Sequence, residues 1–264
     1  MTLFRAECLR EQGAVQQCEE LARSLAGHPI AADVALLGSR ASTLLSLALR
    51  GLGQLRQAVT AATAAAVRAE AHAAVAPGPE ATPLRVQAQL ALISALAESD
   101  RVPEAWTECQ LLEDLLTEDI DGQIAGKTYW AIGNVAFLRD RVQEGQRYHE
   151  RAARHLSPAT DLDLWAKFNS DSAQMRLTAQ IVDQQTLECI ERAELAAEIV
   201  GGNPPERLEL VMTRAQWHHQ MGETDEAVEL LRPVCAQFGM LASHTAGKAS
   251  FLLGRCLQEQ GQAR

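Results

Sequence analysis

The chain has 264 residues, which is long enough to bury a substantial core in one large domain or in an extended array of repeats. Its formal net charge of −10 argues against direct nucleic-acid binding by this segment, because affinity for phosphates comes largely from Lys and Arg. Ala and Leu are abundant, aromatic residues make up only 4%, and no stretch alternates apolar and polar residues as a strand does. We therefore predict an all-α protein.

Residues 1–13 carry charges and lack the apolar core of a signal peptide. The longest uncharged apolar stretch, residues 58–67, is far shorter than the roughly 20 residues that a membrane helix requires. The cysteines are widely spaced and form no Cys-x-x-Cys motif, so we interpret them as small, reduced core residues. They are Cys8, Cys18, Cys109, Cys189, Cys235 and Cys256. These features predict a cytoplasmic protein with no membrane partner.

A repeat becomes visible when the expected turns between helices are compared in chain order. The turn residues are Gly13, Gly53, Asp100, Asp140, Gly222 and Gly261. Each follows an apolar or large residue by four positions, and each of the first five precedes a small residue by five. The preceding residues are Leu9, Leu49, Leu96, Ala136, His218 and Leu257, and the small residues are Cys18, Ala58, Ala105, Gly145 and Ala227. The pattern predicts a first helix, a tight turn, and a second helix that approaches the first closely.

The turns recur about every 40 residues and predict one repeat domain over residues 1–264. We expect units at roughly 1–28, 29–78, 79–120, 121–158, 159–203 and 204–240, with a partial unit at 241–264. Segments rich in Gly and Pro separate them, among them Gly201-Gly202-Asn203-Pro204-Pro205. The fifth unit is degenerate, and there we expect helices at roughly 162–179 and 186–200 with a turn near Asp183.

Two short patterns carry a resemblance to a known family. The first-helix signature of tetratricopeptide repeats resembles two segments of this chain, Tyr129-x2-Ile132-Gly133-x2-Ala136 and Ser250-x2-Leu253-Gly254-x2-Leu257. The second-helix pattern of the same family resembles Ala227-x3-Leu231-x2-Val234. The units are nearer 40 than 34 residues long, and Tyr129 alone keeps the aromatic residue of the signature. HEAT-like repeats have a similar length, but they do not supply the turn Gly or Asp with a small residue five positions later. The resemblance implies a right-handed superhelix of about six helix pairs plus a final helix.

Three segments suggest a catalytic or ligand-binding motif, but each departs from what such a motif requires. The segment 122–128, GQIAGKT, ends like a P-loop, but the first Gly of that motif would fall on Asp121 and no strand precedes it. His218 and His219 are adjacent and point about 100° apart on a helix, which suits a metal poorly. The carboxylates Glu223, Asp225, Glu226 and Glu229 fit the start of a helix, where acidic groups are favourable. We expect no enzyme activity, no cofactor and no metal.

A superhelix of helix pairs presents its first helices on a concave surface that binds partners. In the fourth unit, Lys127, Trp130, Asn134 and Phe137 share one helical face, and Gly133 lies on the opposite, packing face. The amide of Asn134 can donate and accept together and so can pair with an extended peptide backbone. The predicted ligand-binding residues of the whole groove are Lys127, Trp130, Asn134, Phe137, Lys167, Asn169, Gln216, His219, Phe251 and Arg255.

Arrays of this length are similar to the C-terminal regions of bacterial helix-turn-helix transcription regulators. The resemblance implies a module that binds a peptide or protein effector in its groove and forms a homodimer. The chain begins well into a first helix and stops shortly after Gly261, so we expect a segment of a longer protein or one closed off by a partner. The alternative function is a constitutive adaptor that joins two proteins without an effector.

Overall fold

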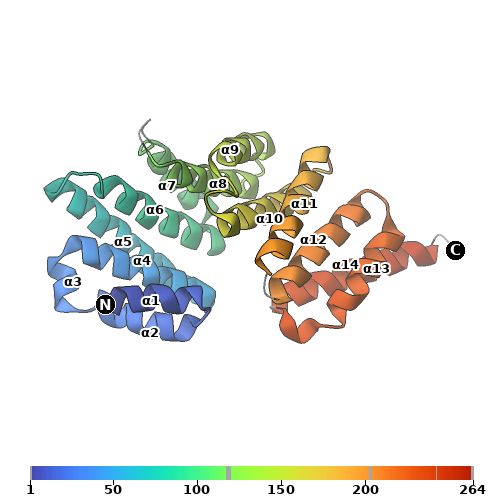
Figure 1. Cartoon of the computed structure of the whole chain (residues 1–264), viewed down its shortest axis with the longest axis horizontal. Helices are drawn as coiled ribbons and strands as arrows, with labels where there is room; N and C mark the ends of the chain where they lie inside the picture. Colours follow the sequence, from blue (N-terminus) through green and yellow to red (C-terminus); the bar gives the residue numbers. More distant parts are fainter. Residues whose placement is uncertain (1, 117–119, 202–203, 242, 263–264) are drawn as a thin grey trace. The chain divides into compact units, whose positions relative to one another are not determined.

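The computed structural model describes residues 2–116, 120–201, 204–241 and 243–262, and over these ranges it contains helices and no strands (Figure 1). The chain divides into two compact units, Met1–His155 and Leu156–Arg264. The N-terminal unit contains α1 (Thr2–Glu11), α2 (Val15–Ala26), α3 (Pro29–Asp33), α4 (Ala35–Gly51), α5 (Leu55–Val75), α6 (Ala81–Glu98), α7 (Val102–Glu113), α8 (Gly122–Leu138) and α9 (Val142–His155). The C-terminal unit contains α10 (Leu162–Thr178), α11 (Gln184–Val200), α12 (Pro204–Gln220), α13 (Thr224–Cys235), the short 3-10 helix η1 (Phe238–Met240) and α14 (Ser243–Gln262).

Each unit is a series of helix pairs. In the N-terminal unit α1 packs on α2, α4 on α5, α6 on α7 and α8 on α9. The first helices of successive pairs are also in contact, because α4 packs on α6 and α6 packs on α8. In the C-terminal unit the pairs are α10 with α11 and α12 with α13, and α14 packs on α13. The prediction of an all-α helical repeat is therefore confirmed.

The turn inside every pair uses the same backbone device. Gly13, Gly53 and Gly222 have positive φ angles, as do the non-glycine residues Asp100 and Asp140, at 60° and 57°. The residue after each turn donates its N–H to the carbonyl four positions before the turn, as Arg101 does to Leu96 at 3.0 Å. This is the Schellman pattern, which satisfies carbonyls that the end of a helix leaves without partners. The bond uses a backbone carbonyl, so it sets the geometry of the turn and does not select the side chain four positions before it.

The turn of the fifth unit differs from the prediction. Gln180, not Asp183, carries the positive φ of 59°, and it lies 40 residues after Asp140. Asp183 instead caps α11, where its carboxylate accepts from the backbone N–H of Thr186 at 2.9 Å. A second difference concerns Gly261, which lies within α14 and forms no turn.

Small residues let the two helices of a pair approach closely. Cys18, Ala58, Ala105 and Ala227 at the predicted small position are fully buried. Gly133 on α8 and Gly145 on α9 serve the same purpose in the fourth pair. A Cβ atom on Gly133 would lie within 3 Å of the His149 ring, so the glycine is needed for this contact.

The cysteines are thiols, and four of them are buried. Burial raises the pKa of Cys109 to about 12, which keeps this thiol protonated and unreactive.

In the described part of the chain no helix combines the length and the apolar character needed to cross a membrane. Gly201, at a positive φ of 77°, ends α11, and the predicted break at Gly202-Asn203 lies outside the described residues.

Candidate functional site

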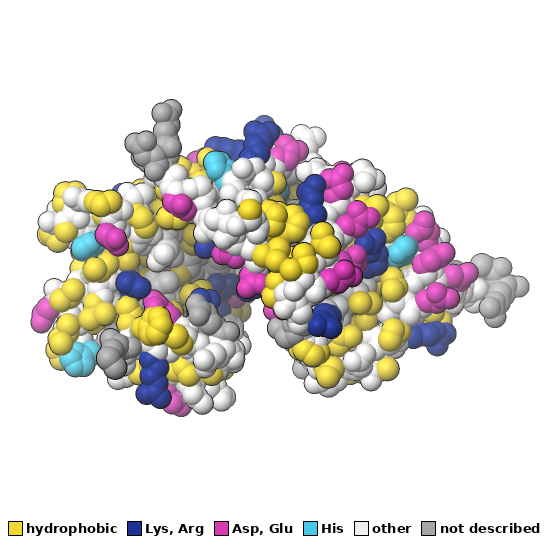
Figure 2. Space-filling model, in the orientation of Figure 1, with side chains coloured by type: hydrophobic (Ala, Val, Ile, Leu, Met, Phe, Trp, Pro, Cys, Tyr) yellow, Lys and Arg dark blue, Asp and Glu magenta, His cyan; other side chains and the backbone are white. Residues whose placement is uncertain are grey.

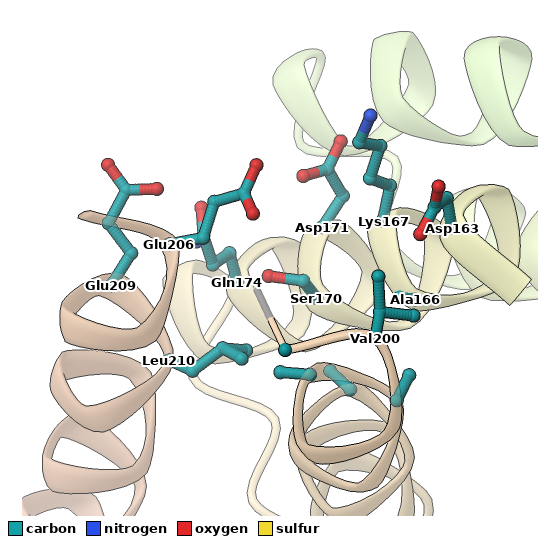
Figure 3. Close-up of a pocket in the computed structure, with 14 residues that line it drawn as sticks. Asp163, Ala166, Lys167, Ser170, Asp171, Gln174, Val200, Glu206, Glu209 and Leu210 are labelled. Carbon is teal, nitrogen blue, oxygen red and sulfur yellow. The ribbon is translucent and has the colours of Figure 1, made fainter. Parts of the chain in front are cut away.

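A hollow of about 530 Å³ opens in the C-terminal unit between α10 and α12, with α11 also contributing to its wall (Figure 3). We call it the acidic groove. Its lining residues are Asp163, Ala166, Lys167, Ser170, Asp171, Gln174, Ala193, Ala196, Ala197, Val200, Gly201, Glu206, Glu209 and Leu210. The volume falls within the range of typical ligand sites, which is roughly 300–1,000 Å³.

One face of α10 supplies the charged wall of the acidic groove. Asp163, Lys167 and Asp171 follow one another at four-residue intervals, so their side chains share this face. They project from the same side of the helix in Figure 3. The helix begins at a fixed residue because the carboxylate of Asp161 accepts from the backbone N–H of Leu164 at 2.9 Å. The charged face is thus positioned by an ordinary capped helix.

Small side chains on α11 leave the space that the groove occupies. Ala193, Ala196, Ala197 and Val200 line it at helical spacing, and the first two are buried. The left-handed Gly201 ends the helix, and its carbonyl accepts from the guanidinium of Arg207 at 2.9 Å. This part of the wall is apolar, whereas the rim is charged.

The charge of the acidic groove is strongly negative. Asp163, Asp171, Glu206 and Glu209 provide four carboxylates, and Lys167 provides one ammonium group. The pKa of Asp171 is raised to about 6, chiefly by burial and also by the neighbouring Glu209, while Lys167 opposes the shift. A cation entering the groove would stabilise the ionised form of Asp171.

A second hollow, of about 420 Å³, opens in the N-terminal unit among the first helices α1, α4, α6 and α8. We call it the basic groove. Its lining residues are Phe4, Glu7, Cys8, Arg10, Arg40, Thr43, Leu44, Leu47, Arg50, Gln87, Leu90, Ala91, Ser94 and Lys127. Here four cations accompany one carboxylate, which is the reverse of the acidic groove.

The residues predicted in the fourth pair fall into different environments. Lys127 lines the basic groove, and Trp130 is partly buried. Asn134 does not stand free on a surface, because its side-chain oxygen lies 3.0 Å from Nε2 of His149 on α9. Phe137 is only 7% exposed and meets the His149 ring edge-on at 5.1 Å between centroids, so it belongs to the core. Asn134 and Phe137, which were predicted to face a groove, therefore point toward the partner helix α9.

Two of the candidates on α10 and α12 are also engaged within the protein. Asn169 is 1% exposed and donates to the carbonyl of Trp165 at 2.7 Å, which places it in the core rather than on a groove. Lys167, in contrast, is exposed and lines the acidic groove. Gln216 is partly buried, and Nε2 of His219 lies 3.1 Å from a carboxylate oxygen of Glu259.

The two candidates on α14 are exposed, but neither lines the acidic or the basic groove. Phe251 is 69% exposed, and the guanidinium of Arg255 lies 3.7 Å from Glu259 one turn away. The carboxylates Glu223, Asp225, Glu226 and Glu229 are exposed at and after the start of α13, as expected for acidic groups at a helix N-terminus. Figure 2 shows acidic side chains gathered over this part of the C-terminal unit.

The acidic residues of the C-terminal groove are the main feature that the sequence analysis missed. Of these, Asp163, Asp171 and Glu206 were not among the candidates, and neither were Arg10, Arg40 and Arg50 of the basic groove. A signal existed in the spacing, because Asp163 and Asp171 lie four residues before and after the candidate Lys167, which lines the acidic groove. Placing the turn at Gln180 would have put α10 in register with the other first helices.

No family model matches the chain, and no curated protein matches its sequence. Among solved structures it is similar to a Rap protein complexed with competence and sporulation factor, with a TM-score of 0.66 and 12% identity over 100% of this chain and 76% of that one. It is also similar to the Rap conjugation gene regulator of the plasmid pLS20 in complex with the Phr* peptide, with a TM-score of 0.60 and 14% identity over 99% and 73%. A third neighbour is the assembly chaperone of RpL4, Acl4, with a TM-score of 0.54 and 18% identity over 100% and 96%.

The chain has a tetratricopeptide-like repeat fold. At identities of 12–18% the likeness concerns the fold and transfers no ligand. The ligands of this tetratricopeptide-like protein depend on the chemistry of its own grooves.

Proposed function

We propose that this protein is a peptide-binding module and that its acidic groove holds an extended peptide by a basic side chain or a free amino group. The observation that carries the proposal is the combination of four carboxylates with an apolar wall in one hollow of about 530 Å³. Carboxylates form short, strong hydrogen bonds with ammonium and guanidinium groups, and the small side chains of α11 leave room for the peptide's apolar residues. One neighbour of the same fold is a complex with the Phr* peptide, which supports this choice of ligand class.

The charges of the groove favour a cationic ligand over a neutral one. Asp171 is partly buried and makes no hydrogen bond with the described residues, so its carboxylate loses water without gaining a donor from the protein. A ligand cation would supply that donor. Lys167, one turn before Asp171, offsets only one of the four negative charges.

We further propose that the module senses an effector peptide within a bacterial transcription regulator and forms a homodimer. The second candidate is a constitutive adaptor, which is favoured by the presence of a second groove of opposite charge in the N-terminal unit. An effector sensor must bind peptide differently in two conformations, whereas an adaptor need not. Small-angle scattering and analytical ultracentrifugation with and without peptide separate the two, since only the sensor changes shape or association state.

The test of peptide binding uses two fluorescent hexapeptide pools that differ only in carrying one Lys or one Gln. We expect the Lys pool to bind more tightly, and Asp171→Asn with Glu209→Gln to weaken its binding by at least about tenfold, which corresponds to about 1.4 kcal/mol. The matched control is Glu229→Gln, which removes an exposed carboxylate of α13 outside the groove. Equal binding of both pools, or equal affinity after the groove substitutions, would refute the proposal.

A further inference from the structure

The basic groove combines positive charge with an apolar surface. Arg10, Arg40, Arg50 and Lys127 come from three different first helices, α1, α4 and α8, and converge on one hollow of about 420 Å³. Leu44 and Ala91 are buried in its wall, and Leu47 and Leu90 are partly buried beside them. Phe4 is 69% exposed at the same hollow. An exposed aromatic ring beside convergent cations is typical of a binding surface rather than of a solvated helix face.

Two of the cations already hold carboxylates of the protein itself. The guanidinium of Arg40 lies 2.9 Å from Glu7, and Arg50 binds both carboxylate oxygens of Glu98 on α6. These pairs show that Arg40 and Arg50 are oriented to bind carboxylates. Lys127 makes no ion pair with the described part of the chain, so its ammonium group is available to a ligand.

We infer that the basic groove binds a partner protein through a short acidic segment, in which two or more closely spaced carboxylates flank an apolar side chain. The carboxylates would bind Lys127 and compete with Glu7 for Arg40, and the apolar side chain would contact Phe4 and the leucines. Charge-assisted pairs of this kind give specificity and steer association, while the apolar contact supplies most of the affinity. The segment is thus the chemical opposite of the cationic peptide proposed for the acidic groove.

A polyanion fits the groove less well than an acidic peptide. Nucleic-acid binding relies on many phosphate contacts over an extended basic surface, whereas the chain carries a net charge of −10 and the cations are confined to one hollow. The lining leucines and Phe4 also offer nothing to a free phosphate. An aliphatic or aromatic side chain of a peptide, in contrast, uses them directly.

The test measures binding of the full chain to a fluorescein-labelled octapeptide pool with two Glu and two Leu residues at varied spacing. The comparison pool carries Gln in place of Glu. We expect preference for the Glu pool and a loss of at least tenfold for Lys127→Gln and for Arg40→Gln. The matched control is Arg56→Gln, which removes an exposed arginine of α5 outside the groove and should leave affinity within twofold. Circular dichroism of each variant establishes that it is folded.

Three outcomes would overturn the inference. Equal binding of the Glu and Gln pools, or equal affinity for all three variants, would show that the groove does not select carboxylates. Tighter, Lys127-dependent binding of a single-stranded oligonucleotide or of polyphosphate would identify a general anion site instead. Loss of self-association in Lys127→Gln, measured by sedimentation without peptide, would assign the surface to a second copy of the chain. Because Asp171→Asn should leave acidic-peptide binding unchanged, this test and that of the acidic groove can fail separately.

Discussion

The acidic groove and the basic groove are both lined by helical faces whose residues recur every three or four positions, yet their charges are opposite. Four of the five charged side chains that line the acidic groove are carboxylates, and four of the five that line the basic groove are cations. The turns that organise the helices are alike in both units. The repeat therefore determines where a groove forms, and a few exposed side chains determine what it attracts. Such side chains contribute little to the core, so each groove can change its ligand without changing the fold.

The largest expected effect compares two glycines of the same signature. Gly133 in the N-terminal unit has no space for a side chain, because a Cβ atom would meet the ring of His149, whereas Gly254 in the C-terminal unit has open space around it. We expect Gly133→Leu to lower the free energy of unfolding by about 3 kcal/mol through overpacking and Gly254→Leu to have little effect. Thermal and urea unfolding followed by circular dichroism measure both. Similar melting temperatures for the two variants would contradict the close contact between α8 and α9.

The next effect, of at most the same size, concerns the free-energy cost of an ionised Asp171 in the acidic groove. The pKa of Asp171 is raised from 3.8 in its ordinary state to about 6 in the folded protein, so its stabilising contribution is complete below pH 4 and is lost as the pH rises through 6. We expect Asp171→Asn to raise stability at pH 7.5 by up to about 3 kcal/mol and to change nothing at pH 4. Unfolding curves at the two pH values, with Glu229→Gln as the exposed control, measure this. A gain that persists at pH 4 would point to packing rather than to charge.

The smallest effect concerns the turns. Gln180 adopts a positive φ of 59°, a conformation that glycine adopts at lower cost. At the equivalent position of the turn between α12 and α13 the residue is already a glycine, Gly222. We expect Gln180→Gly to raise the free energy of unfolding by about 0.5–1 kcal/mol, because the relief of the left-handed conformation exceeds the entropy that glycine adds to the unfolded chain. Gly222→Gln should lower stability by a similar amount. Chemical denaturation detects differences of this size, and a destabilised Gln180→Gly would mean that the glutamine side chain contributes more than its backbone strain costs.

The fold was predictable because its determinants are local. Turn residues such as Gly13 and Asp100, and buried small residues such as Cys18 and Ala58, follow directly from the geometry of a tight turn between close helices. The fifth turn was misplaced because neither Gly nor Asp marks it, and Asp183, which the sequence offered instead, is a helix cap.

The grooves were less predictable because they depend on which helical face packs. Asn134 was interpreted as a surface residue, but a rotation of the face by a fraction of a turn brings its amide to His149. The same small error put Phe137 and Asn169, both buried, among the groove candidates. Charges that converge from several helices, such as Arg10, Arg40 and Lys127, are far apart in sequence, and no local pattern joins them.

The uniform turns have a consequence for how such a chain can change in length. Because each turn is closed by its own two backbone hydrogen bonds, residues added between pairs do not disturb the contact within a pair. The 21-residue α5 with the loop that follows it is such an addition, and it leaves the turns at Gly53 and Asp100 unaltered. Insertions and deletions should therefore be tolerated where the second helix of a pair ends, and they should destabilise the fold at the turns. Changes in chain length are thus expected in the segments between helix pairs.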